Sequence, residues 1–180
     1  MATSQTTPPS TDLVYTEPAL TAELLDRFDT FAREVALHDG VSAFSEQTRI
    51  ELTKALRERT GSDWFRPEGF FIASEKEDDA SIAAFTWTKI PTGQVRGELS
   101  PAGEIYVVGV NPDSQGGGLG RTLTLRALAY LALAADESGE PLHAIELYVD
   151  ADNTAAYSLY TSLGFSVATV DRMYAPGHAA

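Results

Sequence analysis

The segment from Glu104 to Phe165 constrains the fold most strongly, because it contains the same order of patterns twice. An apolar run over Glu104–Val110 predicts a buried strand, and a glycine-rich turn over Gln115–Gly120 leads from it into a segment with helical apolar spacing. A second strand over Ala144–Val149 then precedes a helix that begins near Asn153. Strands that alternate with helices predict parallel βαβ units, which belong in a sheet covered by helices.

The glycine-rich turn favours binding of an anion. Consecutive backbone N–H groups at the start of a helix can converge on a phosphate, and glycines leave that backbone bare. The spacing excludes two common phosphate motifs, because Arg121 replaces the last glycine of a dinucleotide fingerprint and no lysine precedes Thr122. A flexible surface loop is the alternative interpretation. The turn contains four glycines, at Gly116, Gly117, Gly118 and Gly120.

The whole chain predicts one α/β (α+β) domain over residues 13–175. We expect a disordered tail over residues 1–12, because this segment is rich in Ser, Thr and Pro, and a frayed end over residues 176–180. An antiparallel meander followed by the βαβ units gives a mixed, mostly antiparallel, twisted sheet flanked by helices. The predicted strands are Leu13–Thr16, Phe70–Ser74, Ser81–Ile90, Glu104–Val110, Ala144–Val149 and Ser166–Tyr174, and the early helices run from Ala19 to about His38 and from Ser45 to about Arg59.

Composition excludes several classes of function. The net charge of −13 argues against binding of nucleic acid and favours a substrate that carries an amine. No cysteine is present, so a thiolate nucleophile is excluded, and three scattered histidines argue against a metal centre. The start of the chain has no signal-peptide pattern, and no apolar stretch approaches the length of a membrane span. The sequence therefore predicts a cytoplasmic protein.

Two motifs resemble the GNAT N-acetyltransferases. The first motif is the pattern Q-x-x-G-x-G, formed by Gln115, Gly118 and Gly120. It is similar to the pyrophosphate loop with which that superfamily binds acyl-CoA. The segment Asp152–Phe165 also resembles the superfamily and follows the loop in the expected order. The resemblance implies a single GNAT acyl-CoA N-acyltransferase domain that uses acetyl-CoA as the acetyl donor.

Over about residues 38–174 the chain resembles the mycothiol synthases, a family within the GNAT enzymes. The similar segments include Trp64–Gly69, Phe85–Lys89, Gly103–Pro112, Gln115–Thr124 and Leu147–Phe165. Members of that family resemble two GNAT domains in tandem, and this chain has the length of one. The resemblance implies direct transfer of acetyl to the cysteinyl amine of cysteinyl-glucosaminyl-inositol, by a monomer or a homodimer.

The resemblance also assigns a binding site for acetyl-CoA. Free N–H groups at the edge of the Val108–Val110 strand would polarise the thioester carbonyl, which requires a local separation of strands. The start of the second helix would contribute further contacts. The expected binding residues are Val108, Gly109, Val110, Gln115, Gly116, Gly117, Gly118, Leu119, Gly120, Arg121, Asn153, Thr154, Ala155, Ala156, Tyr157 and Ser158.

Two residues are candidates for proton transfer. Glu104 lies at the start of an apolar strand and matches the family's general base. The alternative role for this residue is a solvated acid at a strand end. Tyr160 lies about two helical turns after Asn153 and matches the family's general acid, although a core tyrosine is the alternative.

Glu46, Lys89, Glu104 and Tyr148 match positions of the family that contact the acceptor. For Glu46, a favourable interaction with a helix dipole is an alternative role. Two other functions remain open at this point. One is a GNAT enzyme that acts on another small amine or a protein N-terminus, and the other is a non-catalytic half of a tandem protein that binds acyl-CoA.

Overall fold

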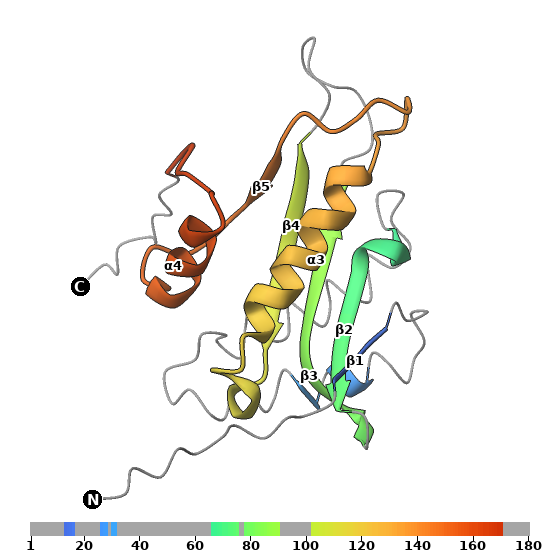
Figure 1. The fold of residues 1–180 in the computed structure, drawn as a ribbon, viewed down its shortest axis with the longest axis vertical. Helices are drawn as coiled ribbons and strands as arrows, with labels where there is room; N and C mark the ends of the chain where they lie inside the picture. The colour runs from blue at the N-terminus through green and yellow to red at the C-terminus, as the bar shows by residue number, and fades with distance from the viewer. Residues whose placement is uncertain are drawn as a thin grey trace, which may run out of the picture. The chain divides into compact units, whose positions relative to one another are not determined.

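The computed structural model describes residues 13–16, 26–28, 30–31, 66–75, 78–90 and 102–170. The chain divides into two compact units, Met1–Tyr148 and Val149–Ala180, because most contacts between residues fall within one unit or the other. The first unit contains the sheet and the glycine-rich loop, and the second contains helix α4 (Thr154–Ser162) (Figure 1).

The first unit is built on a five-stranded sheet with the strand order β1-β2-β3-β4-β5. Neighbouring strands pair antiparallel from β1 to β4, and β4 pairs parallel with β5. This arrangement confirms the predicted mixed, mostly antiparallel sheet. The strands are β1 (Leu13–Thr16), β2 (Phe70–Glu75), β3 (Asp78–Lys89), β4 (Gly103–Val110) and β5 (Ile145–Leu147), and a short 3-10 helix, η1 (Pro67–Gly69), precedes β2.

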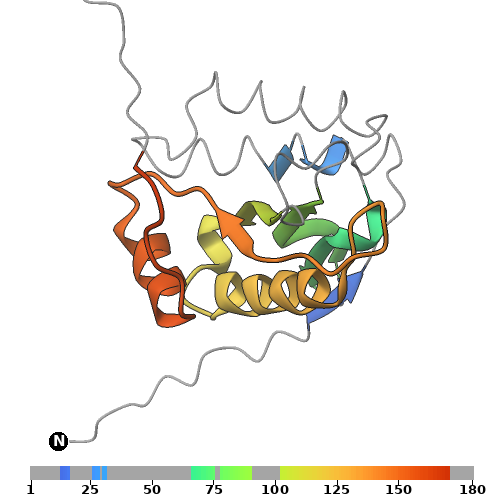
Figure 2. The ribbon, with the colours of Figure 1, turned by 90° about the horizontal axis from the view of Figure 1, so that it is seen from above.

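Helix α3 (Leu119–Leu133) covers one face of this sheet (Figure 2). Its apolar residues recur every three to four positions, so Leu119, Leu123 and Leu131 face the strands and are buried. Leu119 and Leu123 share a core cluster with Phe71 and with the alanines of β2 and β3.

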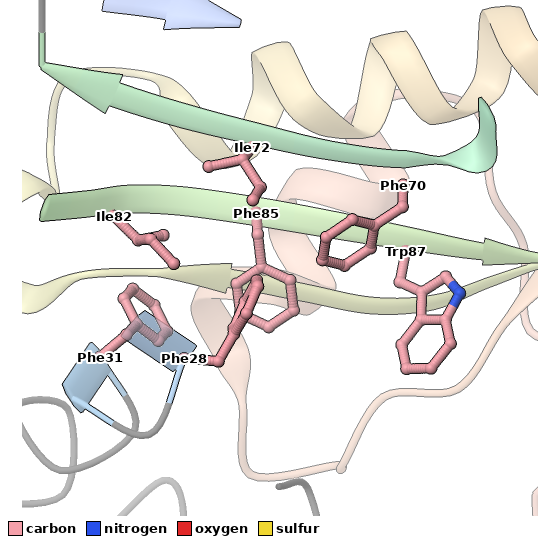
Figure 3. Packing of buried hydrophobic residues seen from close by; sticks show 7 residues of the cluster. All are labelled: Phe28, Phe31, Phe70, Ile72, Ile82, Phe85 and Trp87. Atoms are coloured by element: carbon pink, nitrogen blue, oxygen red, sulfur yellow. The ribbon is translucent and has the colours of Figure 1, made fainter. Parts of the chain in front are cut away.

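The opposite face of the sheet carries an aromatic core (Figure 3). Helical residues 26–28 and 30–31 bring Phe28 and Phe31 onto this face, where their ring centroids lie 4.8 and 5.4 Å from that of Phe85. Both contacts are edge-to-face, an arrangement that favours the ring quadrupoles. Phe70 and Trp87 extend the same core along β2 and β3, and Figure 3 shows all of these rings on one side of the strands.

Helix α4 of the second unit is closed at both ends by its own sequence. The Asn153 side chain accepts a hydrogen bond from the Ala156 N–H at 3.1 Å, which caps the first turn. At the other end Gly164 has φ +96°, and the Phe165 N–H donates to the Tyr160 carbonyl at 3.1 Å. Glycine takes this left-handed conformation without strain, so the helix ends there.

Most of the predicted elements that fall on described residues are confirmed, with two corrections. The predicted strand over Ala144–Val149 is shorter, because its pairing with β4 covers only Ile145–Leu147. The predicted last strand is wrong over residues 166–170, which join none of the described strand pairings. A strand forms only where a neighbour supplies hydrogen bonds, and an apolar pattern alone does not supply them. Residues 171–174 of that prediction, and most of the two early helices, lie outside the described residues.

Candidate active site

The glycine-rich loop joins β4 to α3 and is exposed. Asn111 begins it by accepting a hydrogen bond from the Asp113 N–H at 3.0 Å, which starts the short helix η2 (Pro112–Ser114). Gly116 and Gly118 then adopt φ values of +78° and +82°. A Cβ atom at either position would meet no heavy atom within 4 Å, so backbone conformation and not space requires these glycines.

Helix α3 begins at the end of the loop, and no side chain caps the backbone N–H groups of its first turn. Gly118 is the N-cap residue and offers no side-chain hydrogen bond, and no acidic residue occupies the first turn. The first intrahelical bond runs from the Thr122 N–H to the Gly118 carbonyl at 3.0 Å. The N–H groups of Leu119 and Gly120 precede that bond, so they are available to an anion beside the positive end of the helix dipole. This geometry fits a phosphate group.

We expect Gly118→Ala to lower the free energy of unfolding by about 1–2 kcal/mol, because an L-residue at φ +82° is strained. The same change should weaken coenzyme A binding, since it disturbs the N–H groups at the start of α3. Urea unfolding and calorimetric titration with coenzyme A measure the two effects. Gly117→Ala is the matched control for stability, because its Cβ would lie an ordinary 3.8 Å from the Ser114 carbonyl oxygen. Equal unfolding free energies for the two variants would contradict the strain argument.

Strand β4 contains an extra residue that reverses which edge its N–H groups face. Trp87 pairs with Val107, but Thr88 pairs with Ile105, so Tyr106 forms a bulge. Before the bulge, the Gly103 N–H donates toward β5, to the Ala144 carbonyl at 2.9 Å. After it, the Asn111 N–H donates toward β3, to the Ala83 carbonyl at 2.8 Å. In a regular strand these two odd-numbered residues would donate to the same side.

The bulge leaves an open edge beside the glycine-rich loop. Because N–H groups alternate along a strand, those of Val108 and Val110 point away from β3. Strand β5 pairs with β4 only as far as Ile105, so within the described part of the first unit no strand covers this edge. The β4–β5 pairing thus ends before Val108, which leaves these N–H groups without a partner strand among those described.

Glu104 and Lys89 form an ion pair at the other end of β4. They are direct cross-strand partners, and the Lys89 Nζ atom lies 3.4 Å from Glu104 Oε2. The Glu104 side chain is 12% exposed and that of Lys89 31%. The Lys89 ammonium also lies 5.8 Å from the centre of the Tyr106 ring, which in turn packs edge-to-face on Trp87. Aromatic and charged groups thus hold a nearly buried carboxylate on the face opposite α3.

Helix α4 carries the remaining predicted residues within the second unit. Asn153 is its N-cap, and residues 154–158 form its first turns. The Tyr160 ring packs against Phe165 with a centroid separation of 6.0 Å. Burial raises the pKa of the Tyr160 phenol above its ordinary value of 10.0, so the hydroxyl keeps its proton at neutral pH. A protonated hydroxyl is what a general acid must offer.

The structure brings some predicted residues together. Val108–Val110 and the Gln115–Arg121 loop are continuous in the first unit, and Lys89 contacts Glu104. Tyr148 follows β5 and is 69% exposed. The residues of α4 belong to the second unit, and Glu46 lies outside the described residues.

Two features of this site were not predicted from the sequence. Lys89 was expected to contact the acceptor, and its ion pair with Glu104 was not predicted. The second feature is Glu146, which lies directly beside Glu104 in the parallel β4–β5 register. Alternation along β5 was the available signal, because a glutamate between Ile145 and Leu147 must face away from their side of the sheet.

Neither a metal site nor a membrane span is found in the described residues. No group of three or more His, Cys, Asp or Glu side chains there could hold a metal ion. None of the helices that the structure describes is long and apolar enough to cross a membrane.

Known proteins similar to this chain agree with its fold. Residues 35–165 match the family described as the acetyltransferase (GNAT) family. The mycothiol acetyltransferase of Rothia mucilaginosa (strain DY-18) is 82% identical over 131 residues, which are 73% of this chain and 37% of that protein. The chain thus spans little more than a third of that relative's length.

Two solved structures share the fold at low sequence identity. A protein from Pyrococcus horikoshii OT3 superimposes with a TM-score of 0.67 at 20% identity, covering 89% of this chain and 93% of that one. The PaiA N-acetyltransferase of Thermoplasma acidophilum, solved in complex with coenzyme A, gives a TM-score of 0.59 at 20% identity, covering 88% and 92%.

Proposed function

The chain belongs to the acetyltransferase (GNAT) family, and we propose that it transfers the acetyl group of acetyl-CoA directly to a primary amine. One observation carries this proposal: the open edge of β4 runs straight into the glycine-rich loop. Acetyl-CoA needs a donor for its thioester carbonyl oxygen and a cradle for its pyrophosphate, and these two features would supply both within one unit.

The cofactor assignment rests on the loop. Its exposed backbone, its left-handed glycines and the uncapped start of α3 suit a pyrophosphate. The Thermoplasma structure of the same fold was solved with coenzyme A, which supports that ligand. Acetyl-CoA supplies an acetyl group activated as a thioester. Gln115–Arg121 and the start of α4 would bind it, and the Val108 and Val110 N–H groups would polarise its carbonyl.

Glu104 and Tyr160 are the proposed base and acid. The acceptor nitrogen forms a bond to the acetyl carbon as the carbon–sulfur bond breaks. Glu104 takes one proton from the acceptor ammonium before attack, and the Tyr160 hydroxyl gives one to the departing sulfur. The nitrogen loses a second proton as the amide forms, and this proton restores the Tyr160 hydroxyl through solvent. The near-burial of the Glu104 carboxylate and the raised pKa of Tyr160 support these roles. A thiol-linked acetyl-enzyme is excluded, since the chain contains no cysteine.

The proposed acceptor is the cysteinyl amine of cysteinyl-glucosaminyl-inositol, in mycothiol biosynthesis. The name and the 82% identity of the Rothia relative support it. Because the chain spans 37% of that protein, its activity and its acceptor are inferences for this chain. The sugar–inositol part of the acceptor would contact Tyr148, Lys89 and Glu46. Lys89 would remain paired with Glu104 in that contact.

The test measures release of coenzyme A from acetyl-CoA by the 180-residue chain, with and without cysteinyl-glucosaminyl-inositol. The product is identified by mass spectrometry. Release that depends on the acceptor, with an acetylated product, would support the proposal. Binding of acetyl-CoA without release would favour the alternative of a non-catalytic half that binds acyl-CoA. Turnover with a different small amine or a protein N-terminus would retain the enzyme and replace the acceptor.

A further inference from the structure

We propose that Glu146 on β5 is a specificity-determining residue that binds the ammonium group of the acceptor beside Glu104. This inference rests on the proposed function, since it concerns the acceptor of that same reaction. The Glu146 carboxylate lies on the last strand of the described sheet, and its proposed role differs from that of Glu104. Glu146 would hold the cation, and Glu104 would remove its proton.

Three charged side chains form a row across neighbouring strands. Lys89 of β3 pairs in register with Glu104 of β4, and Glu104 pairs in register with Glu146 of β5. Residues in register on neighbouring strands project from the same face of a sheet. The row therefore crosses β3, β4 and β5 on one face.

The position of α3 identifies that face. A Cβ atom on Gly103 would lie 2.9 Å from Leu131 of α3, so Gly103 faces that helix. Alternation along β4 then turns Glu104 to the opposite side, and the register turns Glu146 to the same side as Glu104. This is also the side of Trp87 and Tyr106, whose rings pack edge-to-face. Glu146 is exposed there, whereas Glu104 is almost buried.

The charges of the row do not balance. Lys89 lies 3.4 Å from Glu104 and offsets its charge, which leaves the charge of Glu146 in excess. Two carboxylates side by side on neighbouring strands destabilise a sheet. Within the described residues no cation lies against Glu146. A substrate ammonium would complete the row, and the net charge of −13 would attract that substrate.

A charge that only keeps an edge strand from pairing with other chains is the competing explanation for Glu146. The two explanations differ in what neutralisation does. If Glu146 only protects the edge of the sheet, its neutralisation leaves the kinetics unchanged. If Glu146 binds the acceptor, its neutralisation raises the KM of the acceptor. The acceptor nitrogen carries positive charge both in the bound ammonium and in the transition state of its attack on the thioester. Glu146 would stabilise these two states equally, so its loss should leave kcat unchanged.

The experiment compares Glu146→Gln with Glu140→Gln in the full chain, at saturating acetyl-CoA and varied cysteinyl-glucosaminyl-inositol. Glu140 is exposed in the loop between α3 and β5, so its neutralisation changes net charge equally without touching the row. Glu146→Gln should raise the KM of the acceptor about two- to fivefold, the value of an exposed ion pair. Its kcat and its KM for acetyl-CoA should match the wild type. Higher ionic strength should raise the wild-type KM toward that of the variant.

Three results would overturn the inference while leaving the proposed function intact. They are an unchanged acceptor KM in Glu146→Gln, an equal rise in Glu140→Gln, and a fall in kcat at constant KM. The second would assign the effect to the net charge of the whole protein, and the third would move Glu146 into the chemical step. A wild-type chain that forms no acetylated product would instead overturn the proposed function.

Discussion

Glu104→Gln should lower kcat about 10²–10⁴-fold, the usual contribution of a positioned general base. Glutamine matches the shape of glutamate but accepts no proton at neutral pH. Coenzyme A affinity should stay at the wild-type value, because the glycine-rich loop follows the opposite end of β4. Rapid measurement of coenzyme A release and calorimetric titration with coenzyme A give the two quantities.

A second variant separates the loss of the base from the loss of its ion pair. Glu104→Gln also removes the contact of 3.4 Å with Lys89. Lys89→Gln removes that contact and keeps the carboxylate, so it should reduce kcat far less. If both variants lost activity equally, the ion pair would explain the effect. Wild-type turnover of Glu104→Gln at every pH would remove Glu104 from catalysis.

Tyr160→Phe should lower kcat about 10²-fold or more, because it removes the hydroxyl that protonates the departing sulfur. Stability should change little, since phenylalanine keeps the ring contact with Phe165. Steady-state kinetics and thermal unfolding measure both effects. Tyr130→Phe is the matched control, because Tyr130 packs on Phe71 of the sheet in the same edge-to-face way. Wild-type kinetics in Tyr160→Phe would identify Tyr160 as a core residue.

The raised pKa of Tyr160 predicts a pH dependence with a definite sign. Burial favours the neutral phenol, so the folded chain holds this proton more tightly than the unfolded chain. The associated stability is complete below the ordinary value of 10.0 and is lost as pH rises through the higher value of the folded state. An ultraviolet titration of phenolate should therefore lose a group that titrates above 10.0 when Tyr160 is replaced by phenylalanine. Loss of a group that titrates below that value would contradict the prediction.

Local features of the site were predictable because each depends on a few consecutive residues. Gly116 and Gly118 adopt the left-handed conformation that a glycine-rich turn favours. Asn153 caps the helix that follows it, as an asparagine before an apolar-periodic segment predicts. The predicted last strand fails over residues 166–170, which pair with none of the strands that the structure describes.

The sequence by itself determined the order of strands and helices, the glycine-rich loop and the candidate residues on each element. Only the tertiary structure decided which of those residues meet. The bulge at Tyr106 sets which N–H groups reach the open edge, and the register brings Lys89, Glu104 and Glu146 into one row. Both depend on hydrogen bonds between strands that are far apart in the chain. A shift of register by one residue would turn each side chain to the other face, so the row exists only in the folded sheet.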